Sequence, residues 1–329
     1  MPTDTTTATP RVIVTLGDFA GIGPELAVRL LSKAENLQTA IVSLVATKDE
    51  VEQLTNAADV EVPLAESPQL GAVHLIDPAS GYGDVPTGRA SKEGGLRAFG
   101  DLQRAVDLVN DQMADGIMFL PLNKSSLHMA GMEEEDELRW FAKRLKHDGF
   151  TSELNLIEGM TTSRVTSHIA LSEVATYISA GRVRQAINLL YRTIAATGDA
   201  APRIGVAALN PHAGENGTFG REEIDHIAPG VELAREVDGI DAQGPFPSDT
   251  LFIRARRGDF DGVVTMYHDQ GQIAMKLIGF DQGVTVQGGL PVPIATPAHG
   301  TAFDIVGKST PDLNPSQRAF DVLVQMAHT

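Results

Sequence analysis

The chain has 329 residues, of which 42% are hydrophobic and 21% charged, and it contains no cysteine. Its 26 Lys and Arg against 43 Asp and Glu give a net charge of −17, which disfavours nucleic acid and anionic membranes as partners. No apolar run approaches the roughly 18 residues of a membrane span, and the Thr-rich N-terminus lacks a signal-peptide pattern, so we expect a cytoplasmic protein.

Short β-branched runs alternate with amphipathic helical patterns along nearly the whole chain. The strand pattern occurs at 12–16, 39–47, 116–120, 203–209 and 261–267, and the helical pattern at 26–31, 92–114, 181–197, 221–237 and 316–326. This alternation predicts an α/β fold with mostly parallel sheets. The length favours two domains, but no linker separates them, so we expect two lobes that share one continuous chain path.

The stretch GDFAGIGPE, residues 17–25, joins the first predicted strand to the first predicted helix. A dinucleotide-binding turn of the G-x-G-x-x-G type needs a third glycine, and Leu26 occupies that position. Glu25 also adds a negative charge to the first helical turn, where a pyrophosphate would have to bind. We interpret the stretch as a structural elbow and expect the cofactor to bind elsewhere.

Three of the nine histidines lie at a strand end or turn among polar neighbours. His168 lies in RVTSHIALSE, His212 in ALNPHAGENGTFGRE and His268 in VVTMYHDQGQ. Sites in open α/β sheets form beyond the carboxyl ends of strands, and three neutral imidazoles suit zinc, cobalt or nickel. Because the chain contains no cysteine, a metal site has to be built from His, Asp or Glu. The alternative is that these are ordinary surface or core histidines.

Four further charged residues are candidates for chemistry. Asp249 and Asp269 could orient imidazoles or act as bases. Lys276, on the expected helix after His268, could hold a carboxylate, and Lys124 follows a strand end. For each residue alone, the alternative is a solvated or salt-bridged charge.

Six motifs resemble, in order, those of the 4-hydroxythreonine-4-phosphate dehydrogenase family: GDFAGIGPE, LPLNKSSLHMAG, TSHIALSEV, LNPHAGENGTFGREE, MYHDQGQIAMKLIGF and HGTAFDIVGK. The resemblance implies a homodimeric, two-lobed α/β/α enzyme like the isocitrate and isopropylmalate dehydrogenases, with its active site in the cleft between the lobes. The first lobe would comprise residues 10–140 and 296–329. The second, 141–295, would carry the metal ligands and dimer contacts.

The resemblance also implies roles for individual residues. His168, His212 and His268 match the three ligands of one divalent metal ion (zinc, cobalt, nickel or magnesium), and Lys276 matches a substrate-binding lysine. The segment with His299, Gly300, Thr301 and Asp304 is similar to a loop that binds NAD or NADP. The metal would lower the pKa of a substrate hydroxyl, and Asp249, Asp269 or Lys124 would take its proton as hydride leaves for the nicotinamide. If the product is a β-keto acid, decarboxylation follows.

The expected substrate site departs from the family pattern. Phe150 stands in place of a histidine, before a retained Thr151, while Thr285 replaces an asparagine and Ile294 an arginine. Two donors to a phosphate are thereby lost, each worth about 1.5–3 kcal/mol. We therefore expect a non-phosphorylated hydroxy or dihydrodiol carboxylate, similar to the substrate of terephthalate dihydrodiol dehydrogenases.

Three other readings remain open. The first is a 4-phosphohydroxy-L-threonine dehydrogenase of pyridoxal phosphate biosynthesis. A more remote one is an enzyme like the phosphate acetyltransferases, which share a related two-lobed fold but need no metal. The last is a regulatory protein that kept the fold and lost catalysis, which the retained Lys276, Asp249 and Asp269 disfavour.

Overall fold

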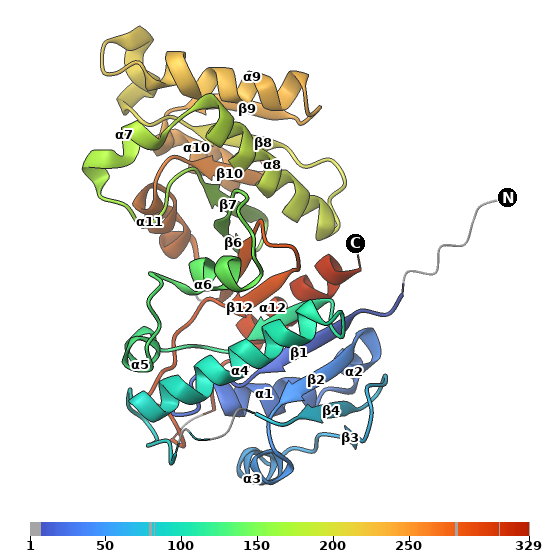
Figure 1. Cartoon of the computed structure of the whole chain (residues 1–329). Helices are drawn as coiled ribbons and strands as arrows, with labels where there is room; N and C mark the ends of the chain where they lie inside the picture. The colour runs from blue at the N-terminus through green and yellow to red at the C-terminus, as the bar shows by residue number, and fades with distance from the viewer. Residues whose placement is uncertain (1–7, 79–80, 82, 280–281, 309, 329) are drawn as a thin grey trace, which may run out of the picture. The chain divides into compact units, whose positions relative to one another are not determined.

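The computed structural model describes residues 8–78, 81, 83–279, 282–308 and 310–328. The chain forms two compact units, one of Met1–His147 with Pro291–Thr329 and the other of Asp148–Leu290 (Figure 1). The boundaries expected from the sequence resemblance lie at 140/141 and 295/296, within a few residues of these. Each unit is described by itself below.

The first unit is an α/β assembly whose strand order is β3-β4-β2-β1-β5-β12, with every neighbouring pair parallel. Its strands are β1 (Arg11–Thr15), β2 (Ile41–Val45), β3 (Leu64–Ala65), β4 (Val73–Ile76), β5 (Gly116–Phe119) and β12 (Ile294–Pro297). Its helices are α1 (Gly23–Leu31), α2 (Ala34–Thr39), α3 (Lys48–Ala58), α4 (Lys92–Asn110), α5 (Lys124–Met129), α6 (Glu137–Arg144) and α12 (Asn314–Ala327). In Figure 1, α4 crosses in front of β1 and β2.

The second unit has the strand order β11-β6-β7-β10-β8-β9. The pairs of β6 with β11 and β7 are antiparallel, and the remaining neighbours are parallel. Its strands are β6 (Ser152–Ile157), β7 (Met160–Arg164), β8 (Ile204–Ala207), β9 (Ala242–Phe246), β10 (Gly262–Thr265) and β11 (Val284–Gly288). Its helices are α7 (Val174–Tyr177), α8 (Ala180–Ala196), α9 (Ala228–Glu236), α10 (Ser248–Arg256) and α11 (His268–Gly279), with short segments η1 (Leu171–Glu173), η2 (Pro211–Gly217) and η3 (Glu223–Ile227).

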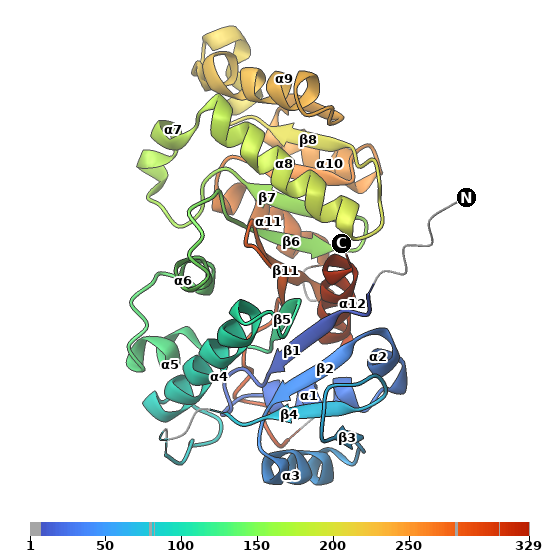
Figure 2. The same cartoon turned by 45° about the vertical axis from the view of Figure 1, so that its right-hand side comes forward.

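Helices cover both faces of the second unit's sheet. α8 packs on β7 and β10 from one side, where a Cβ added at Gly262 would meet Ile194 and Leu190 (Figure 2). On the other side α10 and α11 bury a cluster that includes Leu251, Met275 and Val263. This is the three-layer arrangement expected when parallel strands are buried on both faces.

The predicted elements are confirmed with small shifts at their ends. All five predicted strands exist as β1, β2, β5, β8 and β10, and four of the five predicted helices as α1, α4, α8 and α12. The fifth, at 221–237, is split into the π-helical turn η3 and α9. The β6–β7 hairpin was not predicted. It turns tightly through Glu158 and Gly159, where Gly159 has a φ of 74°.

A buried charge cluster lies beside the glycine elbow of the first unit. Arg97 on α4 is 1% exposed, donates to Asp101 Oδ2 at 2.8 Å and to Glu50 Oε2 at 3.2 Å, and lies 5.1 Å above the ring of Phe19. Burial raises the pKa of Asp101 to about 7, although the positive charge of Arg97 opposes this. Phe19 therefore has a packing role as the cover of Arg97.

No helix in the described residues combines the length and the hydrophobicity that a membrane span requires.

Candidate functional site

Two parallel strands end side by side in the second unit and bring two histidines together. β7 and β10 pair up to Arg164 and Thr265, and the ladder continues beyond them. The N–H of Val165 donates to Thr265 O at 2.9 Å, and Thr166 donates to Met266 O through its N–H at 3.1 Å and its hydroxyl at 2.7 Å. Because the ends are held in this register, the residues that follow them, His168 and His268, emerge at the same edge.

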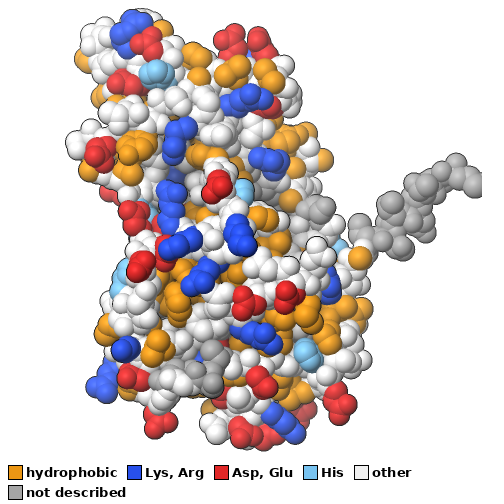
Figure 3. Space-filling view, in the orientation of Figure 1, with side chains coloured by type: hydrophobic (Ala, Val, Ile, Leu, Met, Phe, Trp, Pro, Cys, Tyr) orange, Lys and Arg blue, Asp and Glu red, His pale blue; other side chains and the backbone are white. Residues whose placement is uncertain are grey.

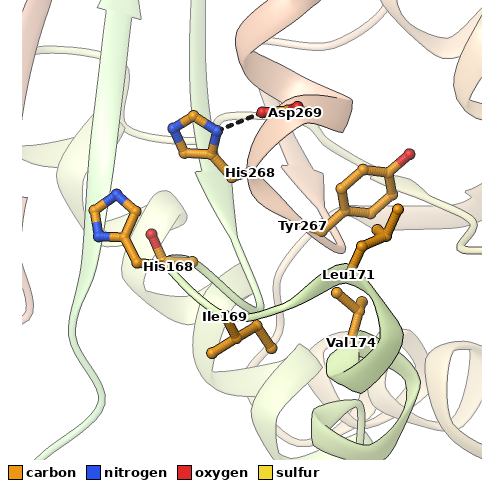
Figure 4. A pocket seen from close by; sticks show the side chains of 8 residues that line it. His168, Ile169, Leu171, Val174, Tyr267, His268 and Asp269 are labelled. Carbon is orange, nitrogen blue, oxygen red and sulfur yellow. Dashed lines mark hydrogen bonds and ion pairs between the residues drawn. The ribbon is translucent and has the colours of Figure 1, made fainter.

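The two imidazoles face one another across the mouth of a small pocket (Figure 4). Their ring centroids are 5.7 Å apart and the ring planes are inclined at 44°. The pocket measures about 260 Å³ and is lined by Ser167, His168, Ile169, Leu171, Val174, Tyr267, His268 and Asp269. A pocket of this size, with two ring nitrogens at its mouth and an apolar wall behind, suits a small polar ligand.

Asp269 fixes the orientation of His268. Its Oδ1 lies 2.7 Å from Nδ1 of the ring, which leaves Nε2 as the nitrogen available to a ligand (Figure 4). Carboxylates that bind the second nitrogen of an imidazole are typical partners of metal-ligating histidines. The start of α11 is fixed in turn by Gln270, which accepts from the N–H of Met266 and donates to Ala208 O, both at 2.7 Å.

His212 does not join this pair. It lies exposed on η2, where residues 212–216 all have positive φ, and its ring is 6.3 Å from that of Phe219. Buried Glu223 on η3 holds the base of this loop by accepting from the N–H groups of Leu209 at 2.9 Å and Asn210 at 2.7 Å. Across the described part of the chain, no three His, Asp or Glu side chains are grouped to hold a metal ion. The expectation that all three imidazoles meet is therefore not fulfilled in this structure, because the unusual path of η2 directs His212 elsewhere.

The other candidate charges do not line the pocket. Asp249, in the first turn of α10, and Lys276, eight residues along α11 from His268, are both exposed. Eight helical residues correspond to a rise of about 12 Å, which keeps Lys276 away from the imidazole pair. Lys124, also exposed, begins α5 in the first unit. Within the second unit, Asp269 is the candidate base that contacts a histidine of the pair.

The four residues expected at the substrate site differ in exposure. Phe150 and Thr151, just before β6, are partly exposed. Thr285, on β11, is partly buried, with its hydroxyl 3.3 Å from Asn155 Oδ1. Ile294 is fully buried in β12, opposite Ile117. This burial is what a β-branched side chain inside a parallel sheet is expected to show, and it does not support the expected contact of Ile294 with a substrate.

The expected cofactor loop packs on the glycine elbow of the first unit. The N–H of Ile22 donates to Thr301 O at 3.0 Å, and a Cβ on Gly21 would lie 2.7 Å from that oxygen. Thr301 is 7% exposed, whereas Gly300 and Asp304 are exposed. Burial lowers the pKa of His299, so its imidazole is neutral at pH 7. The elbow thus supports a loop rather than cradling a phosphate itself.

Two polar residues near the histidines were not among the sequence candidates. Arg164 is buried, ion-pairs with Glu153 and donates to Ser167 Oγ at 3.0 Å, so it positions the residue before His168. Glu223 positions the loop of His212. A signal for Glu223 existed, since its motif FGREE belongs to one of the stretches that carry the resemblance, whereas a strand arginine such as Arg164 gives none.

Comparisons with known proteins identify the family of this chain. Residues 26–323 match the family model described as "Pyridoxal phosphate biosynthetic protein PdxA". A Pseudomonas aeruginosa protein named "Putative 4-hydroxythreonine-4-phosphate dehydrogenase 2" is 49% identical over 96% of this chain and 97% of its own. D-threonate 4-phosphate dehydrogenase from Cupriavidus necator is 38% identical, over 92% of this chain and 93% of its own. The crystal structure of a 4-hydroxythreonine-4-phosphate dehydrogenase from Burkholderia phymatum superposes with a TM-score of 0.78 at 35% identity, covering 97% of this chain and 98% of that one.

The terephthalate branch is represented more distantly. The crystal structure of a terephthalate 1,2-cis-dihydrodiol dehydrogenase from Burkholderia xenovorans superposes with a TM-score of 0.71 at 25% identity, covering 96% of this chain and 98% of that one. The comparisons therefore favour the phosphorylated-substrate alternative over the dihydrodiol expectation.

Proposed function

The chain belongs to the PdxA family and is an oxidoreductase of the dehydrogenase class, and on this premise we propose that it oxidises the secondary alcohol of a four-carbon hydroxy acid 4-phosphate. The two candidate substrates are 4-phosphohydroxy-L-threonine and D-threonate 4-phosphate. Hydride passes to NAD or NADP, the alcohol proton passes to a base, and the resulting β-keto acid loses carbon dioxide. The single observation that supports the site is the pairing of His168 with His268 beside Asp269.

The residues present fit a divalent metal ion. Two imidazoles at one sheet edge, one with its second nitrogen on a carboxylate, form a partial set of nitrogen donors that suits zinc, cobalt or nickel. The ion would act as a Lewis acid on the substrate oxygens. His212 is the proposed third ligand, and it reaches the pair either by rearrangement of η2 or from a second copy of the chain.

Roles for the remaining residues follow from their contacts. Asp269 is engaged with His268, so we assign it the orientation of that ring and leave Asp249 and Lys124 as the candidate bases. Lys276 is proposed to hold the substrate carboxylate. The loop from His299 to Asp304, supported by Gly21, is proposed to bind the dinucleotide.

We also propose that the working form is a homodimer. Exposed apolar side chains lie in the second unit: Leu171 is 70% exposed, and Ile273 and Leu277 on α11 are 60% and 83% exposed. Large exposed aliphatic side chains on one helix face are typical of surfaces that another chain covers. Sedimentation velocity of the purified protein tests this, and a monomer at micromolar concentration contradicts it.

A dihydrodiol carboxylate remains the second candidate substrate. The apolar Phe150 supports it, whereas the burial of Ile294 removes its other support.

The deciding experiment supplies purified protein with NAD or NADP and with zinc, cobalt or magnesium. It measures reduced nicotinamide with each phosphorylated acid, its non-phosphorylated parent and terephthalate cis-dihydrodiol. Turnover of a phosphorylated acid that is at least tenfold more efficient than that of the others supports the proposal. Turnover of the dihydrodiol alone contradicts it, and the His268→Ala variant controls for contaminating dehydrogenases.

A further inference from the structure

An arginine beside the pocket has no acidic partner among the residues that the structure describes. Arg182, in the first turn of α8, extends its guanidinium between two aromatic rings, with its central carbon 5.8 Å from the ring centroid of Phe150 and 5.9 Å from that of Tyr177. Both distances are within the range of a cation–π contact. Aromatic faces hold a guanidinium in place without neutralising its charge.

Few hydrogen bonds involve the N–H groups of this guanidinium in the described part of the chain. Its Nη2 makes a long contact of 3.4 Å with Val165 O, and its Nε is buried without a hydrogen-bond partner among the described residues. Within the same part of the chain no carboxylate pairs with Arg182, whereas Arg184, two residues away, pairs with Asp238 at 2.6 Å. A buried donor without an acceptor costs about 1–3 kcal/mol, so a ligand that supplied an acceptor to this guanidinium would recover part of that cost.

The location of Arg182 ties it to the candidate site. Val165 stands two residues before Ser167, and Tyr177 stands three residues after Val174, and both Ser167 and Val174 line the pocket. The arginine therefore contacts both chain segments that form one wall of the pocket. Lys and Arg side chains also gather on the face of this unit shown in Figure 3, although the chain as a whole carries −17.

We propose that Arg182 binds the phosphoryl group of the substrate and so determines specificity for phosphorylated over free hydroxy acids. This inference rests on the proposed function. A guanidinium presents parallel N–H groups that match two phosphate oxygens, and its stacked, partly buried position strengthens that attraction. The arginine also supplies, next to the apolar Phe150, a hydrogen-bond donor in place of the one that the departure from the family pattern removes at that position.

Three variants on one helix test the assignment. Arg182→Ala removes the guanidinium. Arg182→Lys keeps the positive charge without the parallel N–H groups, and Arg192→Ala removes a positive charge ten residues further along α8. Arg192 is a matched control because its Nε donates only to Asn188 O, at 3.3 Å and in an exposed position. Calorimetric titration with inorganic phosphate measures binding without turnover. Steady-state kinetics with each phosphorylated acid and its non-phosphorylated parent measures KM against kcat.

Loss of one charge-assisted hydrogen bond, about 1.5–3 kcal/mol, corresponds to roughly 10–150-fold. We expect Arg182→Ala to raise KM for the phosphorylated acid and weaken phosphate binding within that range, with kcat nearly unchanged and the parent acid unaffected. Arg182→Lys should fall between wild type and Arg182→Ala, and Arg192→Ala should match wild type. Equal phosphate affinity in Arg182→Ala and Arg192→Ala overturns the assignment. If no phosphorylated acid is oxidised but Arg182→Ala still binds inorganic phosphate more weakly than wild type, the proposed function is wrong and the assignment of Arg182 as an anion-binding residue is retained.

Discussion

The N–H of Ile22 donates to the carbonyl oxygen of Thr301 at 3.0 Å, so the turn after β1 and the loop after β12 are held together in the first unit. The neighbouring Gly21 permits this approach because a side chain there would collide with the same carbonyl group. The contact connects a stretch that resembles a dinucleotide cradle to the loop that we propose as the real dinucleotide site.

Gly21→Ala should destabilise the protein. The added Cβ would lie 2.7 Å from Thr301 O, so the loop must move, at a cost of about 1–3 kcal/mol. Gly300→Ala, in the same loop, meets nothing within 4 Å and should stay within about 0.5 kcal/mol of wild type. Urea unfolding of both variants measures the difference, and equal stabilities would show that the contact is not tight.

Removing either histidine of the pair should abolish tight binding of zinc or cobalt. His168→Ala and His268→Ala each remove a nitrogen donor. Asp269→Asn keeps both donors but no longer fixes the ring of His268, so we expect it to weaken metal affinity by only about 10–100-fold. His328→Ala, at the exposed end of α12, is the matched control. Calorimetric metal titration is the measurement, and unchanged affinity in both single histidine variants would exclude this pair as ligands.

Arg97→Met should be strongly destabilising. It leaves Asp101 buried without its cationic partner, which typically costs about 3–5 kcal/mol. Adding Asp101→Asn removes the stranded carboxylate, so the double variant should be more stable than Arg97→Met alone. Denaturant unfolding of the two single variants and the double variant gives the coupling, and additive losses would refute a shared charge network.

Asp238 should contribute a pH-dependent part of the stability. Hydrogen bonds from Arg184 and Asn188 lower the pKa of Asp238 to about 2, from an unfolded value near 4. Because the folded-state pKa is the lower one, the contribution is complete above pH 4 and is lost as the pH falls toward 2. Asp238→Asn should therefore be less stable than wild type at pH 7, and this difference in stability should disappear as the pH falls toward 2.

The control for that prediction is Glu236→Gln, at the end of α9, where no ion pair is present among the described residues. Its stability difference from wild type should not vary between pH 2 and pH 7. A constant difference for Asp238→Asn over the same range would show that the ion pair with Arg184 is too exposed to matter.

The neighbouring positions of His168 and His268 follow from ordinary strand rules. The predicted strand at 261–267 places His268 at a carboxyl end, whereas β7, which precedes His168, was not predicted. Once β7 and β10 pair in parallel, their carboxyl ends lie at one edge. The position of His212 cannot be derived in this way, because a left-handed backbone has no periodicity that a sequence pattern reveals.

Two further residues show where pattern reading fails. Ile294 was assigned to the substrate because of its place in a motif, yet its residue type already favoured a strand core. Arg182 was passed over because a helical arginine is solvated by default, and only the three-dimensional contacts with Phe150 and Tyr177 set it apart.

The left-handed run in η2 limits how this loop can evolve. Only one of its five residues is glycine, and Ala213 and Glu215 each carry a cost of about 1–2 kcal/mol for adopting that conformation. Replacement of Ala213 by glycine or asparagine would make the loop easier to form, whereas valine or isoleucine would make it harder. Descendants of this chain can therefore change these positions chiefly toward small or amide side chains, unless the anchor at Glu223 changes with them.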